Sequence, residues 1–147
     1  MKRMVGAAAV DGVDDLIERY FRAQGEFLRG NPEPVKDLFS HTQDVTLASP
    51  YDGPPVRGWE EVAEAVEHAA SLRSEGEFLE WQIVAKYVTA ELAYVVQIEW
   101  AEAKIGAREE ITPLAVRATM NFRAEEDGEW KIVHRHADPI TTPRPAE

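Results

Sequence analysis

The chain of 147 residues contains no cysteine. This absence excludes disulfide bonds, thiolate metal ligands and cysteine nucleophiles, although it does not identify a compartment. Long apolar runs are also missing, and the apolar part of the opening MKRMVGAAAV is shorter than the core of a signal peptide. We therefore expect a cytoplasmic protein with no membrane partner and a flexible N-terminus.

Basic residues are few and scattered along the chain. Sixteen Lys and Arg stand against 27 Asp and Glu, and the resulting net charge of -11 repels the phosphate backbone of nucleic acids. We therefore expect no nucleic-acid partner. Hydrophobic residues make up 44% of the chain, which is enough to fill the core of one ordinary domain.

Helical patterns dominate the first half of the sequence. Apolar residues recur at steps of three and four residues, which predicts helices over 13–28, 32–41 and 59–72. Residues 44–50 alternate instead like a strand, and the proline at their end has no amide hydrogen to donate to a sheet. Residues 51–58 have the composition of a loop.

The second half changes to a period of two residues, which predicts four consecutive strands in an antiparallel meander. One side of each strand is more apolar and is expected to face the core. These inward positions are Leu79, Trp81, Ile83, Ala85 and Tyr87, then Leu92, Tyr94, Val96, Ile98 and Trp100, then Leu114, Val116, Ala118, Met120 and Phe122, and finally Trp130, Ile132, His134 and His136.

The expected order is two helices, a strand, a helix and four strands, which is an α+β arrangement. The three helices of the N-terminal half would pack on one face of a curved, mostly antiparallel sheet. Such a sheet, covered by few helices, usually leaves a hollow between the two layers. We therefore expect a pocket.

The order of elements, the stretch VRGWEEV and the ending DGEWKIVHRHADP resemble the SnoaL-like branch of the nuclear transport factor two-like superfamily. The resemblance covers roughly residues 12–139, so one domain would span residues 1–147, with 1–11 and 140–147 flexible. It implies a cone-shaped α+β barrel around a central pocket, and a dimer formed through the sheet. Members include ketosteroid isomerase, cyclases, dehydratases and a kinase association domain, so the resemblance assigns no activity by itself.

Comparison with the isomerase implies a role for Tyr20, which stands in the stretch ERYF where the isomerase has the donor to its oxyanion. Two other catalytic positions differ. Ser49 stands where the isomerase has its general base, and Met120 where it has a protonated aspartic acid. Serine is too weak a base for this step, so steroid isomerisation is not expected. Asp52 could replace the base, but an Asp before Gly is more typical of a turn.

The H-x-H motif of His134 and His136 places both rings on one face of a strand, a spacing that can hold zinc. A third ligand would have to come from His41, His68 or Asp138, which form no recognisable set. We therefore expect no metal and no cofactor. The two histidines are then either satisfied core groups or polar anchors in the pocket. Asp138 is either a turn residue or the acceptor that orients a histidine ring.

Two hypotheses for the function remain. In the first, the pocket is the active site of an isomerase, cyclase or dehydratase for a small, largely apolar molecule. Its catalytic residues would be Tyr20, His134 and His136, and Ser49, Trp59, Trp81, Tyr94, Trp100 and Met120 would line the pocket. In the second, the domain only binds a ligand or serves as an oligomeric association module.

The outer face of the sheet is expected to carry charged and polar side chains of mixed sign. These are Gln97, Glu99, Arg117, Thr119, Asn121, Arg123 and Arg135. A solvated face and a protein interface explain such a composition about equally well, since interfaces are not reliably more apolar than other surfaces. With the habit of the family added, we expect a homodimer through this face.

Overall fold

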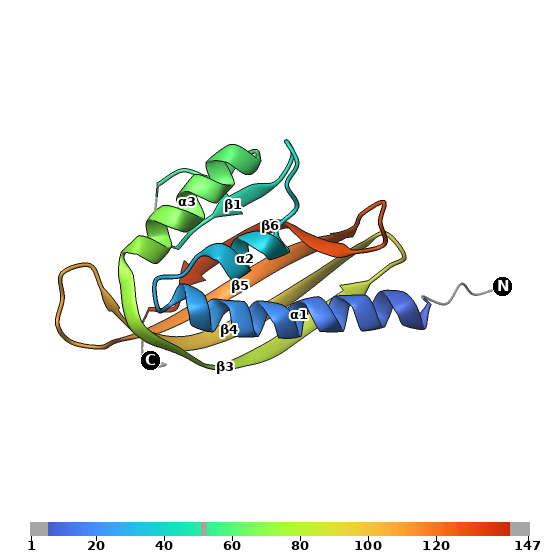
Figure 1. Ribbon diagram of the computed structural model, residues 1–147. Helices are drawn as coiled ribbons and strands as arrows, with labels where there is room; N and C mark the ends of the chain where they lie inside the picture. Colours follow the sequence, from blue (N-terminus) through green and yellow to red (C-terminus); the bar gives the residue numbers. More distant parts are fainter. Residues whose placement is uncertain (1–5, 51–52, 142–147) are drawn as a thin grey trace, which may run out of the picture.

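A computed structural model describes residues 6–50 and 53–141, and Figure 1 shows helices packed on one side of a six-stranded sheet. The helices are α1 (Ala7–Phe27), α2 (Glu33–Leu38) and α3 (Trp59–Ser71). The strands are β1 (Thr46–Ala48), β2 (Val56–Arg57), β3 (Arg73–Val88), β4 (Leu92–Ile105), β5 (Thr112–Ala124) and β6 (Trp130–Pro139). The α+β class is confirmed.

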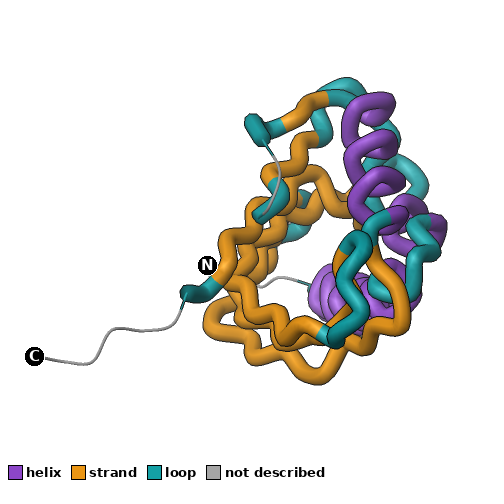
Figure 2. Tube along the Cα trace, turned by 90° about the vertical axis from the view of Figure 1, so that its left-hand side faces the viewer, coloured by secondary structure: helices purple, strands orange, loops and turns teal. Residues whose placement is uncertain are grey.

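The sheet has the strand order β2-β1-β6-β5-β4-β3. Strands β3 to β6 form the expected antiparallel meander, while β1 pairs in parallel with β6. The short strand β2 was not expected, since its residues belong to a segment with loop composition. Figure 2 shows the sheet curling around α1, so the helix lies inside the curve.

Helix α1 presents one apolar stripe to the sheet. Val13, Leu16, Ile17 and Tyr20 are buried at helical spacing. The helix begins at Ala7, so residues 7–11, which were expected to belong to a flexible N-terminus, are helical. Its first turn consists of alanines and a valine, and alanine has the highest helix propensity of all residues. Residues 1–5 and 142–147, also expected to be flexible, lie outside the described residues, as does Asp52.

A close approach joins the end of α1 to the start of β3. Gly76 on β3 is buried, and a Cβ atom at this position would lie 2.5 Å from the main-chain oxygen of Leu28 and 2.6 Å from its Cβ atom. No real side chain fits at these distances. Glycine is therefore required here, because the edge strand lies in contact with the main chain of the helix end.

Strand β5 has the expected orientation. Met120 and Phe122 are buried against the helices, and Arg117 on the opposite face is exposed. Strand β4 has the reverse of the expected orientation. Its buried positions are Ala93, Val95, Gln97, Glu99, Ala101 and Ala103, whereas Leu92 and Tyr94 are exposed on the convex face. The larger apolar side chains of β4 thus lie outside the curve, and small ones face α1.

The side chains of strand β3 do not keep one alternation between the two faces of the sheet along its whole length. Its pairing with β4 shifts register three times, so its alternation changes along the strand. Trp81 packs against the core, but Leu79 and Tyr87 are half or more exposed. The strand forms an edge of the sheet, where bulges are common because they hinder pairing with another chain.

A bulge in β6 decides which way the histidines face. Asn121 pairs with His134 and Phe122 with Ile132, so Val133 is an extra residue on β6. One extra residue exchanges the two faces of a strand beyond it. Ile132 is therefore buried on the concave side before the bulge, and Arg135 is buried on that side after it.

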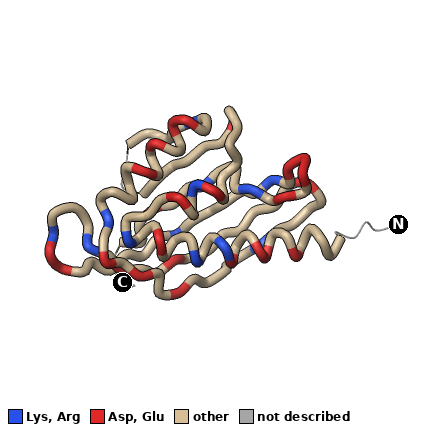
Figure 3. Tube along the Cα trace, viewed as in Figure 1, with Lys and Arg blue, Asp and Glu red and all other residues tan. Residues whose placement is uncertain are grey.

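Figure 3 shows charged residues along the helices, in the loops and also on the strands. Among the charged side chains of the described residues, Glu99 and Arg135 differ from the rest because each is less than one tenth exposed. No helix in the described part of the chain is both long enough and apolar enough to cross a membrane.

Candidate functional site

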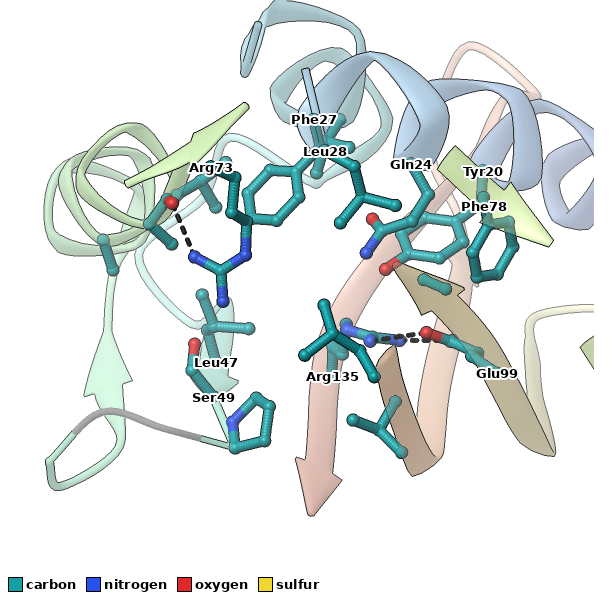
Figure 4. Close-up of a pocket in the computed structure, with 18 of the residues that line it drawn as sticks. Tyr20, Gln24, Phe27, Leu28, Leu47, Ser49, Arg73, Phe78, Glu99 and Arg135 are labelled. Carbon is teal, nitrogen blue, oxygen red and sulfur yellow. Dashed lines mark hydrogen bonds and ion pairs between the residues drawn. The ribbon is translucent and has the colours of Figure 1, made fainter. Parts of the chain in front are cut away.

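A cavity of about 90 Å³ lies between the helices and the concave side of the sheet. Its walls come from α1, α2, α3 and the strands β1, β3, β4, β5 and β6, and most of them are apolar. Phe27, Leu47 and Phe78 contribute much of this surface, as Figure 4 shows. An apolar cavity with a few polar groups directed into it is the usual form of a small-molecule site.

Six polar or charged residues interrupt the apolar walls: Tyr20, Gln24, Ser49, Arg73, Glu99 and Arg135. Tyr20 and Gln24 lie one turn apart on α1, and a spacing of four residues places two side chains on the same helix face. Figure 4 shows both polar ends directed into the cavity. The cluster of Tyr20 and Gln24 forms one end of the site.

Arg135 and Glu99 form a buried ion pair beside this cluster. The Nη1 and Nη2 atoms of Arg135 donate to the two oxygens of Glu99 over 2.8 and 2.9 Å. The Nε2 atom of Gln97 donates a third hydrogen bond to Glu99 over 2.7 Å. Both carboxylate oxygens of Glu99 therefore accept hydrogen bonds from within the protein.

The ion pair spans the strand between its two partners. Glu99 lies on β4 and Arg135 on β6, with β5 between them. Ala118 of β5 lies between Gln97 and Ala137 in the register, and its small side chain leaves room for the arginine to reach across. The charge of Glu99 raises the pKa of Arg135, although burial alone would lower it. Arg135 is thus a permanent cation at the cavity.

Tyr20 lies over the arginine, with the Cζ atom of Arg135 5.1 Å from the centre of the Tyr20 ring. Burial raises the pKa of the Tyr20 phenol above its ordinary value, and the nearby Arg135 offsets only part of this effect. The phenol therefore stays protonated. No described residue forms a hydrogen bond with its hydroxyl group, which leaves the O–H available to a molecule in the cavity.

Arg73 stands on another wall of the cavity. Its Nη1 atom donates to the main-chain oxygen of Ala69 over 2.6 Å, and its Cζ atom lies 5.2 Å from the centre of the Phe27 ring. Figure 4 shows its guanidinium between these groups and Ser49. The site thus has an arginine on each of two walls.

Two of the residues expected from the sequence, Tyr20 and Ser49, line the cavity. His134 and His136 do not, and the expectation that they face inward is wrong. The bulge at Val133 turns both rings to the convex face, where they pair with Asn121 and Thr119. Asp138 joins them there, since its Oδ1 atom lies 3.2 Å from Nε2 of His136.

The histidines have partners of their own on the convex face. Nδ1 of His134 lies 2.7 Å from the hydroxyl of Thr46, and the two histidine rings are 6.4 Å apart. Partial burial lowers the pKa of His134, and the neighbouring His136 lowers it further. Within the described residues, no group of three or more His, Asp or Glu side chains could hold a metal ion.

The other expected lining residues also lie elsewhere. Trp59 stacks on His41 at the start of α3, and Trp81 packs against Phe21. Tyr94 and Trp100 lie on the convex face of β4, and Tyr94 stacks on Tyr87. Met120 is fully buried in the core without reaching the cavity. These residues were predicted to line the pocket because they are aromatic or apolar. Residue type alone does not distinguish the wall of a cavity from the core.

Four polar residues of the site were missed: Gln24, Arg73, Glu99 and Arg135. Glu99 and Arg135 were assigned to the outer face of the sheet. One signal could have identified the face of Glu99. Ala93, Ala101 and Ala103 share its side of β4, and a row of small residues is typical of a strand surface that lies close to a helix.

Comparison with known proteins agrees with this architecture. The family model of the SnoaL-like domain matches residues 13–141. No curated protein matches the chain.

Solved structures with the same fold include a nuclear transport factor 2-like superfamily protein from Salmonella enterica serovar Typhimurium, with a TM-score of 0.75 and 18% identity over 93% of this chain and 94% of that one. A ketosteroid isomerase-like protein from Erwinia carotovora atroseptica has a TM-score of 0.69 and 17% identity over 92% and 96%. A protein of unknown function from Pseudomonas putida has a TM-score of 0.66 and 17% identity over 92% and 89%.

Identities this low establish a common fold and leave the activity open. The match to the family model, in contrast, extends over nearly the whole described chain, from α1 to the residues that follow β6. The chain belongs to the SnoaL-like domain family.

Proposed function

We propose that this protein binds a small, largely apolar molecule that carries an oxygen function, in the cavity between α1 and the sheet. The observation that carries the proposal is the buried pair of Arg135 and Glu99 at the wall of an otherwise apolar cavity. A buried ion pair is usually no more stabilising than apolar residues of the same volume. Its position beside the free hydroxyl of Tyr20 supports a role in ligand recognition.

The same groups favour binding over acid–base catalysis. Tyr20 stays protonated and can donate a hydrogen bond, but it cannot take a proton from a substrate. Glu99 is the one carboxylate among the described lining residues, and Arg135 occupies both of its oxygens. With His134 and His136 on the other face of the sheet, the described residues of the cavity supply donors and no general base.

Three small probes test the proposal. Acetophenone presents a carbonyl oxygen, α-methylstyrene replaces that oxygen with a methylene group, and cyclohexylamine presents a cation. Titration followed by protein NMR should show that acetophenone shifts the signals of residues around Tyr20, that α-methylstyrene binds more weakly and that the amine does not bind. Shifts confined to other surfaces, or no shifts at all, would contradict the proposal.

A matched pair of variants on α3 provides the control. Ala69 lines the cavity, whereas Ala63 on the same helix does not. Ala69→Leu should fill part of the cavity and weaken acetophenone binding, and Ala63→Leu should leave it unchanged. Equal effects of the two changes would show that the probe binds outside the cavity.

We further propose that two chains associate through the convex face of the sheet. This face is more apolar than its expected composition, since Tyr94, Val96, Ile98 and Trp100 lie there with Arg117, Thr119, Asn121, His134 and His136. Leu92 and Tyr87 are more than half exposed beside them. An exposed apolar surface with a polar flank is typical of a protein interface.

A further inference from the structure

We infer that Glu99 makes the cavity selective for uncharged oxygen-bearing molecules over carboxylates. The inference rests on the proposed function, because it concerns which ligands the same cavity accepts. It assigns to Glu99 the role of a specificity-determining residue that acts through Arg135. Three observations carry it: the geometry of the ion pair, its burial, and the donors around it.

The first observation is the charge balance at this end of the cavity. An arginine alone would attract carboxylates, since its planar donors match two carboxylate oxygens. Here that match is already made within the protein, over 2.8 and 2.9 Å. A second carboxylate at Arg135 would have to displace Glu99 or lie beside it.

The second observation is the burial of the pair. The side chains of Arg135 and Glu99 are 10% and 2% exposed, so little water screens them. Like charges repel far more strongly in such surroundings than in water. A ligand carboxylate near Glu99 is therefore disfavoured, and a like charge in the site is a common means of rejecting the wrong ligand.

The third observation is that Glu99 is held in place. Gln97 donates to it from the same strand, and Gln97 is itself 2% exposed. Displacing Glu99 from Arg135 would leave a buried carboxylate with only this one hydrogen bond, at a large cost in free energy. An incoming anion therefore does not easily exchange with it.

The remaining donors suit a neutral oxygen. The hydroxyl of Tyr20 stays protonated, and the carboxamide of Gln24 points into the same space. A ketone, ester or amide oxygen can accept hydrogen bonds from both without bringing a charge. Arg73 stands on another wall, where it donates to the main-chain oxygen of Ala69 and lies over the Phe27 ring.

The test compares acetophenone with benzoate, which has nearly the same shape and is ionised at pH 7. For the wild-type protein, NMR titration should give tighter binding of acetophenone than of benzoate. Glu99→Gln keeps the shape of the side chain and removes its charge. In this variant the affinity for benzoate relative to acetophenone should rise by about tenfold or more.

The double variant Glu99→Gln with Arg135→Gln is the control for the single variant. It removes both charges, so the gain of benzoate over acetophenone should disappear. Thermal melting without probe verifies that each variant is folded. The wild-type comparison needs no variant, and methyl benzoate provides a second neutral ligand for it.

The outcomes separate the two proposals. If acetophenone binds in the cavity but benzoate binds the wild-type protein more tightly, or if Glu99→Gln leaves the ratio unchanged, this inference is overturned and the proposed function stands. If neither acetophenone nor benzoate nor methyl benzoate binds in the cavity, the proposed function fails and this inference fails with it.

Discussion

The guanidinium of Arg135 reaches over β5 to the carboxylate of Glu99, 36 positions earlier in the chain, and meets it with two parallel hydrogen bonds. Glu99→Ala should destabilise the fold by about 3 to 5 kcal/mol, because it leaves the arginine charge buried without a partner. Replacing both residues, Glu99→Leu with Arg135→Met, should recover most of this loss. Urea denaturation measures both values, and equal losses in the single and double variants would contradict the prediction.

The ion pair between Asp44 and Arg123 should make the stability of the fold depend on pH in the acidic range. Arg123 holds the pKa of Asp44 below its ordinary value, with help from the hydroxyl of Thr42. A carboxylate with a lowered pKa stabilises the fold above its unfolded pKa of about 3.9, and the contribution is lost as the pH falls below that value.

Asp44→Asn should therefore lower the melting temperature at pH 7, with a difference that shrinks below about pH 4. Asp37→Asn is the control, since no described residue forms a hydrogen bond or ion pair with its carboxylate. A difference between wild type and Asp44→Asn that stays constant from pH 7 to pH 3 would argue against the ion pair.

The pKa of His134 on the convex face should depend on its neighbour His136. NMR should give His134 a pKa below its ordinary value, because it is partly buried and lies beside His136. His136→Gln removes the neighbouring charge and should raise the pKa of His134 only partly, since burial remains. No change in the pKa of His134 would show that the rings do not interact.

Steroid isomerisation should be absent or very slow. Ser49 and Met120 occupy the positions where the resemblance implies acids, and Glu99 is held by Arg135. Incubation with a β,γ-unsaturated ketosteroid should produce no conjugated enone by ultraviolet absorption. Turnover on the order of 1 per second or faster would refute this expectation.

A dimer through the convex face should appear as twice the chain mass in sedimentation at micromolar concentration. Val96→Arg places a charge in the apolar part of this face and should shift the protein toward monomer. Glu64→Arg, on the exposed side of α3, is the control and should not. A wild-type protein that sediments as a monomer would contradict the proposed dimer.

Sequence patterns predicted the order of the elements well, and they predicted β5 correctly because its two sides differ clearly. Apolar residues such as Met120 and Phe122 alternate there with Arg117 and Asn121. In β4 both sides are largely apolar, so the larger residues were assigned to the core. The structure places the smaller ones inside, because α1 and the cavity occupy that space.

The candidate site was predicted less well, and the reason is local. Tyr20 was found from the resemblance of its stretch ERYF to ketosteroid isomerase, and helical periodicity separately places it on the buried stripe of α1. Arg135 was missed because a period of two cannot reveal a single extra residue, and Val133 is such a residue. The bulge becomes visible only when β6 is paired with β5.

Gly76 limits how far apart two walls of the cavity lie, which the lining side chains do not determine. It lets β3 touch the end of α1 at Leu28, and both elements continue into the cavity wall through Phe78 and Leu28. The separation of the two walls is thus fixed by main-chain contact. Exchanging lining side chains could widen or narrow the cavity, but a residue larger than glycine at position 76 would move a whole wall, so the size of the cavity depends on a residue that does not line it.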